Sequence, residues 1–225
     1  MGLSHSPSLV MNGLVLALDA GNSKSYPGSG TTWTDLSGNS NTGTLTNGPT
    51  YSSANGGSLS FDGVNDYIDF PTTLSNQFSS KSITVFTFAK ISSVVSKNTL
   101  LSFNGAFNFF LPGSRLGPTQ QLYWDSTTSW KGGTTTSWTT NQWYQLAWTI
   151  DSSRNILFYI NGILDYSSTI LVDFSPTNNT AVRIGFANAG EYATGNISNT
   201  QIYNRALFAA EVSQNFNALR GRYGI

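Results

Sequence analysis

The residues best suited to binding chemistry are three tryptophans, Trp124, Trp130 and Trp138, spread along a stretch rich in Ser, Thr and Gly, with Asp125 beside the first. Sugars bind proteins through flat aromatic faces under their C–H surfaces and through polar groups that meet their hydroxyls. Because the neighbouring residues are polar and not aliphatic, at least one tryptophan is predicted to lie outside the core, and Trp130 is the best candidate. The alternative is that Trp124 and Trp138 begin and end core strands, with Trp130 alone on a hairpin tip.

A second loop, residues 186–194, offers further polar and aromatic groups. It contains Asn188, Glu191 and Tyr192, which we add to the candidate glycan-binding residues. These side chains can meet sugar hydroxyls and ring faces in the same way as those around Trp130.

Hydrolytic chemistry is poorly supported. Glycoside hydrolysis normally needs two carboxyls on either side of the scissile bond, and the chain has two Glu, Glu191 and Glu211, far apart in sequence. Asp66 and Asp69 are the densest acidic pair, but a spacing of three places them on opposite faces of a strand. The single histidine, His5, lies near the start of the chain, so a Ser/His/Asp relay has no base. We therefore predict a protein that binds and does not catalyse.

Composition bounds the fold and the partners. Charged residues are 10% of the chain and sum to zero, so no cationic field attracts nucleic acid or an anionic membrane surface. Hydrophobic residues are 39% and cysteine is absent, so packing must stabilise the fold without disulfides. No window approaches the ~20 apolar residues that span a bilayer. We expect one domain over residues 11–225, preceded by a flexible tail over residues 1–10.

Strand patterns separated by Gly, Asn, Ser, Thr and Pro recur along the chain, as in a sandwich. In residues 143–150, alternation places Tyr144, Leu146, Trp148 and Ile150 on one face, which should be core. Residues 151–155 turn the chain into a hairpin, and Asn161 with Gly162 forms a second turn signal.

One helix is predicted near the C-terminus. Its apolar face consists of Val212, Phe216 and Leu219, with Arg220 in the last turn and Gly221 as the residue that ends it.

Seven segments, in order, resemble the laminin G-like branch of the concanavalin A-like lectin/glucanase superfamily. They are GLVLALDA (13–20), WTDLSGNSNTGTL (33–45), LSFDGVNDYI (59–68), ITVFTFA (83–89), WYQLA (143–147), FYING (158–162) and IYNRAL (202–207). The resemblance implies an all-β jelly-roll sandwich of two antiparallel sheets, with the one short C-terminal helix. The acidic motif of the superfamily's glucanases, Glu-x-Asp-x-x-Glu, does not occur.

The resemblance also implies calcium as the cofactor to consider. Asp19 with Asn22, and Asp35 with Asn39, are the candidate ligands. The last strand of relatives usually carries an acidic residue where this chain has Ser198 and Asn199, which weakens the case. The alternative is that the aspartates cap turns through hydrogen bonds to the backbone.

Relatives usually have Ser at the position of Phe208, where Ser-x-x-Glu makes a capping box for the final helix. Glu211 is still present here. Phe208 is therefore a candidate interface residue, held by a partner subunit; the alternative is that it packs on its own sheet.

A lectin-like sandwich that lacks cysteine and has a surface rich in Ser, Thr, Asn and Gly resembles the single-domain laminin G-like proteins of phage particles. The leading hypothesis is a virion decoration or tail/fibre-associated module, made in the host cytoplasm, that adheres to a cell-surface glycan. The alternatives are a structural capsid or tail protein that reads no sugar, and a cellular, extracellular glycan-binding domain. The partners would be glycans or other virion proteins, with a homo-oligomer as a further option.

Overall fold

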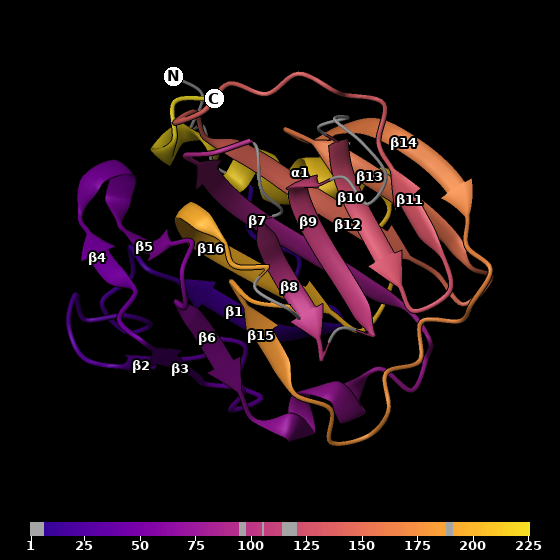
Figure 1. The fold of residues 1–225 in the computed structure, drawn as a ribbon, viewed down its shortest axis with the longest axis horizontal. Coiled ribbons are helices and arrows are strands. Elements are labelled where there is room, and N and C mark those ends of the chain that lie inside the picture. The colour runs from indigo at the N-terminus through magenta and orange to yellow at the C-terminus, as the bar shows by residue number, and fades with distance from the viewer. Residues whose placement is uncertain (1–6, 95–97, 105, 114–120, 188–190) are drawn as a thin grey trace.

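The computed structural model describes residues 7–94, 98–104, 106–113, 121–187 and 191–225, and for residues 112 and 113 it describes the backbone alone. Within them the chain forms two antiparallel sheets packed face to face, with one α-helix near the C-terminus (Figure 1). The predicted all-β jelly-roll sandwich is confirmed.

Sheet A follows the order β14 (Ile163–Thr169), β13 (Asn155–Ile160), β12 (Tyr144–Ile150), β7 (Ile83–Ile91), β16 (Thr194–Tyr203), β5 (Ser58–Asp62) and β4 (Thr50–Ser52). β1 (Leu14–Asp19) pairs with the second half of β16. Sheet B follows the order β11 (Trp130–Gly132), β10 (Gln121–Ser126), β9 (Phe107–Gly113), β8 (Thr99–Phe103), β15 (Val182–Ile184), β6 (Tyr67–Phe70), β3 (Gly43–Thr46) and β2 (Thr32–Trp33). The helical elements are α1 (Ala209–Leu219) and the 3-10 turns η1 (Ala54–Gly56), η2 (Thr72–Gln77) and η3 (Arg220–Arg222).

The main core lies between the two sheets and is rich in aromatic side chains. The alternation predicted for residues 144–150 is confirmed, because Leu146, Trp148 and Ile150 are fully buried in this core and Tyr144 packs against it. Trp148 meets the edge of Phe109 from sheet B at a centroid distance of 5.6 Å. Edge-to-face contacts of this kind add to the burial of apolar area that stabilises the sandwich.

A second apolar layer lies on the outer face of sheet A, where α1 packs. Phe86 and Phe88 point to this side, opposite to the inward residues of the same strand β7, and meet Val212 and Phe216 of α1. The amphipathic face predicted for the helix is confirmed by the burial of Val212 and Phe216, with Leu219 partly buried beside them. The outer face of sheet B therefore lies on the side of the sandwich opposite to α1.

The turns and the position of the helix end follow the sequence closely, but the conformation after the helix differs. β12 and β13 form the predicted hairpin, and Asn161 and Gly162 have the positive φ angles, 51° and 76°, that a tight hairpin turn requires. α1 has Arg220 as its C-cap, so Gly221 takes the position predicted for the residue that ends the helix, but without the positive φ angle typical of such a glycine. α1 stops at Leu219 and the chain continues in η3, which carries Gly221.

The packed domain begins earlier in the chain than predicted. Tyr203 donates its hydroxyl proton to the carbonyl of Val10 at 3.0 Å, and Gln214 donates to the carbonyl of Ser8 at 2.6 Å. Val10 is also 8% exposed within the apolar layer under α1. The boundary at residue 11 is thus too late, and residues 8 to 10 belong to the packed domain; residues 1–6 lie outside the described part of the chain. No helix within the described residues is both long and apolar enough to cross a membrane.

Candidate functional site: the outer face of sheet B

One polar residue from each of five neighbouring strands forms a cross-strand row on the outer face of sheet B. In strand order these are Asp69, Arg183, Ser102, Asn108 and Asp125. Their apolar neighbours along each strand point into the core, so alternation directs these five outward.

The members of the row are joined by hydrogen bonds. Asn108 accepts from Ser102 and donates to Asp125, both at 2.7 Å, and Arg183 donates through Nε to Asp69 at 2.9 Å. Ser102, Asn108 and Asp125 are only 1%, 6% and 6% exposed, so the middle of the row is buried. Groups that reach solvent lie toward its two ends.

Trp130 extends the row on the last strand, β11, where it lies opposite Asp125. Its side chain is 46% exposed, and its ring stacks on Tyr123 with a centroid distance of 5.9 Å and an interplanar angle of 20°. Tyr123 is itself buried against Phe110 and Ala187. Trp130 is therefore an aromatic plate with one supported face, which is the geometry that stacks on the C–H surface of a sugar ring.

The other two tryptophans are not part of this surface. Trp124 is fully buried and Trp138 is 7% exposed, both in the main core, so assigning them as sugar-binding platforms was wrong. Strand alternation is the reason, because Leu122 and Trp124 share the inward face of β10 while Tyr123 and Asp125 take the outward face. Trp138 meets the ring of Tyr144 edge-on at 5.0 Å. The alternative drawn from the sequence placed Trp124 and Trp138 in the core and Trp130 alone on the surface, and this placement is confirmed.

A second aromatic group lies near the other end of the row. The guanidinium carbon of Arg183 is 5.5 Å from the ring centroids of both Tyr67 and Phe186, within cation–π range. Phe186 in turn stacks on Tyr192 at 4.7 Å with an interplanar angle of 20°. All four side chains are partly exposed. Sequence reasoning missed Tyr67, Arg183 and Phe186, although Arg183 between the apolar Val182 and Ile184 signals an outward-facing strand residue.

The loop that carries Glu191 and Tyr192 connects the two groups. Through Ala187 it packs against Tyr123, and through Tyr192 it joins Phe186. The backbone carbonyl of Glu191 accepts the hydroxyl of Thr99 at 2.7 Å, which ties the loop to β8. Asn188 lies outside the described residues.

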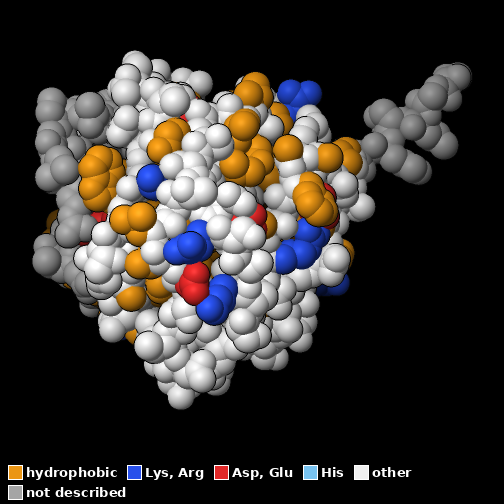
Figure 2. Space-filling model, turned by 90° about the vertical axis from the view of Figure 1, so that its right-hand side faces the viewer, with side chains coloured by type: hydrophobic (Ala, Val, Ile, Leu, Met, Phe, Trp, Pro, Cys, Tyr) orange, Lys and Arg blue, Asp and Glu red, His pale blue; other side chains and the backbone are white. Residues whose placement is uncertain are grey.

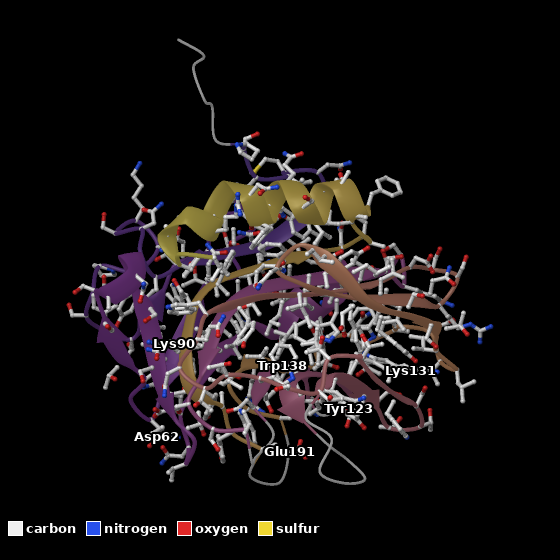
Figure 3. The ribbon with its side chains drawn as sticks, turned by 90° about the horizontal axis from the view of Figure 1, so that it is seen from above. Asp62, Lys90, Tyr123, Lys131, Trp138 and Glu191 are labelled. Atoms are coloured by element: carbon white, nitrogen blue, oxygen red, sulfur yellow. The ribbon has the colours of Figure 1, made fainter. Side chains whose placement is uncertain are left out.

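Figure 3 shows this surface on the lower side of the sandwich, with Tyr123 and Glu191 there and α1 along the upper side. Arg183 and Trp130 lie on strands four steps apart in sheet B, which corresponds to roughly 19 Å at about 4.8 Å per step. A ligand that touches both groups must be longer than a single sugar ring.

The acidic residues near β6 do not form a catalytic pair. Asp66 is 4% exposed and accepts the N–H of Asp62 at 3.1 Å, whereas Asp69 lies on the outer face with Arg183. Burial raises the pKa of the Asp66 carboxyl, and the hydrogen bond from the Val64 N–H lowers the pKa of Asp62. The two pKa values diverge, and both carboxyls accept backbone N–H groups of the turn between β5 and β6.

The first pair of calcium candidates is engaged by protein groups. Nη1 of Arg222 donates to both oxygens of Asp19, at 2.9 and 2.8 Å, and the N–H of Gly21 adds a third hydrogen bond at 2.8 Å. Asn22 accepts the N–H of Lys24 at 3.0 Å. Ser198 accepts from the hydroxyl of Tyr223 at 2.9 Å, which fixes the segment beside Arg222.

The second pair organises the turn between β2 and β3. Asp35 accepts the N–H groups of Ala17, Ser37 and Asn41, and Asn39 donates to the carbonyl of Leu14 at 3.1 Å. No three His, Cys, Asp or Glu side chains within the described ranges gather as a metal site. Because a guanidinium already neutralises Asp19 and backbone donors occupy Asp35, these residues do not fit a calcium ion.

Phe208 does not pack on its own sheet. Its side chain is 74% exposed, so the intramolecular alternative is wrong, whereas the role of Phe208 at an interface stays a prediction. Half of the capping box survives, because Glu211 accepts the N–H of Phe208 at 2.9 Å. The hydrogen bond from Arg205 holds the pKa of Glu211 below its usual range.

Two antiparallel sheets packed face to face, with one helix outside, define a jelly-roll sandwich of the concanavalin A-like type. The chain belongs to the concanavalin A-like lectin/glucanases superfamily, since the Laminin_G_3 family model with that description matches residues 62–213. No curated protein matched the chain.

Several solved structures share the fold. Domain 4 of AbnA, a GH43 extracellular arabinanase from Geobacillus stearothermophilus, was solved in complex with arabinotriose; it is 22% identical with a TM-score of 0.72, over 90% of this chain and 97% of that one. The receptor binding domain of botulinum neurotoxin C/D mosaic serotype is 16% identical with a TM-score of 0.65, over 92% and 51%. Trypanosoma rangeli sialidase is 18% identical with a TM-score of 0.63, over 97% and 36%. The chain thus spans about half of the toxin domain and about a third of the sialidase, and these identities show a common fold.

Proposed function

We propose that this chain is a non-catalytic glycan-binding module whose site is the outer face of sheet B around Trp130. The observation that carries the proposal is the half-exposed Trp130 ring, stacked on the buried Tyr123 and lying opposite Asp125. An aromatic plate that is fixed from beneath loses little conformational freedom on binding, and this favours affinity. The relative solved with arabinotriose is consistent with a sugar ligand for this fold.

The proposed glycan is an oligosaccharide. Trp130 stacks on one ring, and the group of Tyr67, Arg183, Phe186 and Tyr192 binds a second part of the same chain. Only Nε of Arg183 is engaged by Asp69, so the terminal N–H groups of its guanidinium are available as donors to sugar oxygens.

A glycan array with three proteins tests this function. The wild type should bind a defined set of oligosaccharides, Trp130→Ala should lose that set, and Trp130→Phe, which keeps a flat ring, should retain part of it. A hot-spot aromatic contributes about 2 kcal/mol or more, which is roughly 30-fold in affinity. A blank array from well-folded wild type, or equal binding by Trp130→Ala, contradicts the proposal.

We further propose that the module works on a phage particle, as a decoration or tail/fibre-associated protein. The support is the resemblance noted from the sequence, together with the absence of cysteine and the Ser, Thr, Asn and Gly content of the loops. Mass spectrometry of purified particles, before and after a salt wash, should find the protein at a fixed ratio to the capsid protein. Its presence in particles together with a blank array favours a structural protein without sugar binding, and its recovery only outside particles favours a cellular adhesion domain.

A further inference from the structure

A groove on the opposite side of the molecule has features of a second binding site. It lies on the outer face of sheet A, between β12 and β13 and the segment that leads into α1, and has a volume of about 420 Å³. Clefts that bind small molecules typically measure about 300–1,000 Å³. Residues 206–209 form one wall, and Thr84 holds that wall by donating to the carbonyl of Arg205 at 2.8 Å and accepting the N–H of Leu207 at 2.8 Å.

Two largely buried side chains present their hydroxyls to the groove. Thr149 of β12 is 2% exposed and Tyr159 of β13 is 1% exposed, and both line the groove. Neither side chain makes a hydrogen bond to any residue in the described part of the chain. Burial without a compensating hydrogen bond raises the pKa of Tyr159. Because neither oxygen is among the buried, unpartnered polar atoms of the described chain, both hydroxyls open into the groove, where they can donate to and accept from a ligand.

An aromatic ring stands at the rim of the groove. Phe208 lines it and is 74% exposed, although its position immediately before α1 is one where a small polar residue would cap the helix better. An exposed ring beside two hydroxyls that open into the groove gives one apolar face and two polar contacts. This combination is the one that recognises a sugar residue.

The charges around the groove exclude an anionic ligand. Among the described residues that line it, the one carboxylate is Asp151, which accepts the N–H groups of Ser153 and Asn155, both at 2.9 Å, so its negative charge is fixed there. Glu211 lies in the first turn of α1 and is paired with Arg205 at 2.6 Å, which leaves no net positive charge at that helix end. A neutral ligand matches this environment.

We propose that this groove is a second glycan site, which takes a neutral sugar residue against the Phe208 ring and hydrogen-bonds it through the hydroxyls of Thr149 and Tyr159. The site is independent of Trp130, because the two lie on opposite outer faces of the sandwich. The chain would then bind sugars on two sides. Figure 2 shows the side of the molecule between those faces, where hydrophobic side chains are interspersed with polar ones.

The test uses amide chemical shifts of the full chain, titrated with arabinotriose, lactose and maltose as neutral probes. At least one probe should shift amides of residues 149–159 and 206–209. The affinity of that probe for the groove, measured from these amides, should fall at least tenfold in Tyr159→Phe and in Phe208→Ala, whereas Trp130→Ala should leave the affinity for the groove unchanged. Because the two hydroxyls lack partners, Tyr159→Phe and Thr149→Val should melt at or above the temperature of the wild type.

Three results overturn the proposal. The first is that no probe shifts these amides at millimolar concentration. The second is that the shifts persist unchanged in Tyr159→Phe and Phe208→Ala. The third is that the same amides shift on dilution without sugar, which assigns Phe208 to a contact between copies of the chain. Loss of array binding in Trp130→Ala remains a separate result, so failure of this site and failure of the proposed function are distinguishable.

Discussion

The ion pair between Asp19 and Arg222 joins the first strand to the last turn, and its removal should destabilise the fold measurably. The side chains are 20% and 27% exposed, and Arg222 also donates to the carbonyl of Gly56 at 2.9 Å. Arg222→Ala leaves the Asp19 carboxylate largely desolvated, with the N–H of Gly21 as its remaining donor. Loss of one partner costs about 3–5 kcal/mol for a fully buried pair, and a hydrogen bond to a charged group contributes about 1.5–3 kcal/mol.

The expected loss for Arg222→Ala is therefore about 2 kcal/mol, because solvent reaches roughly a quarter of both side chains. For a chain of this size, that corresponds to a decrease in Tm of about 4–8 °C. Thermal unfolding followed by circular dichroism at pH 7 measures it, and urea unfolding gives the free energy. The double variant Asp19→Asn with Arg222→Ala should recover part of the loss, because the unpaired carboxylate is gone.

The pair of Lys81 and Asp173 is the matched control within the same chain. Its atoms are closer, at 2.6 Å, but the side chains are 51% and 41% exposed. Lys81→Ala should leave Tm unchanged within error, since exposed pairs are screened by water and salt. Equal decreases in the two variants, or no decrease in Arg222→Ala, would falsify the reasoning that burial and not distance sets the contribution.

Further predictions concern the core, pH and metal. Trp124→Ala should cost about 3–5 kcal/mol as a core truncation, and Trp130→Ala about half as much because its ring is half exposed; similar losses in urea unfolding would contradict the different placement of the two side chains. The lowered pKa of Glu211 means that its pairing with Arg205 contributes fully above pH 4.5 and is lost as pH falls through the lower pKa of the folded state. The stability difference between wild type and Glu211→Gln should thus be largest at neutral pH and shrink in acid, and a pH-independent difference refutes the assignment. EDTA should change Tm little because Arg222 already neutralises Asp19; a large decrease that calcium reverses would show a metal site.

The sequence by itself determined the architecture of this protein. Alternation through Leu146, Trp148 and Ile150 marks a strand with one buried face, and Asn161 with Gly162 marks a hairpin turn whose positive φ angles few other residues tolerate. These signals are local, so they can be read without knowing which strands become neighbours. The motifs of the superfamily supplied the pairing that local patterns cannot.

Local pattern left the candidate site undecided. Tyr123 and Trp124 are adjacent aromatics, so either phase of alternation places an aromatic ring outward, and only the packing of Leu122 and Trp124 against the opposite sheet sets the phase. Gly221 marks the end of α1 correctly, but the 3-10 turn η3 that follows, in which Arg222 pairs with Asp19 203 positions away, is not visible in the local pattern.

Only the tertiary structure brought together the second aromatic group and the groove. Tyr67 and Arg183 come from separate segments and meet because β6 and β15 pair, and Phe208 and Tyr159 line one groove because Thr84 anchors the chain before α1. The physical reason is that contacts between distant segments depend on which faces the whole chain can bury together, and no short stretch of sequence carries that information.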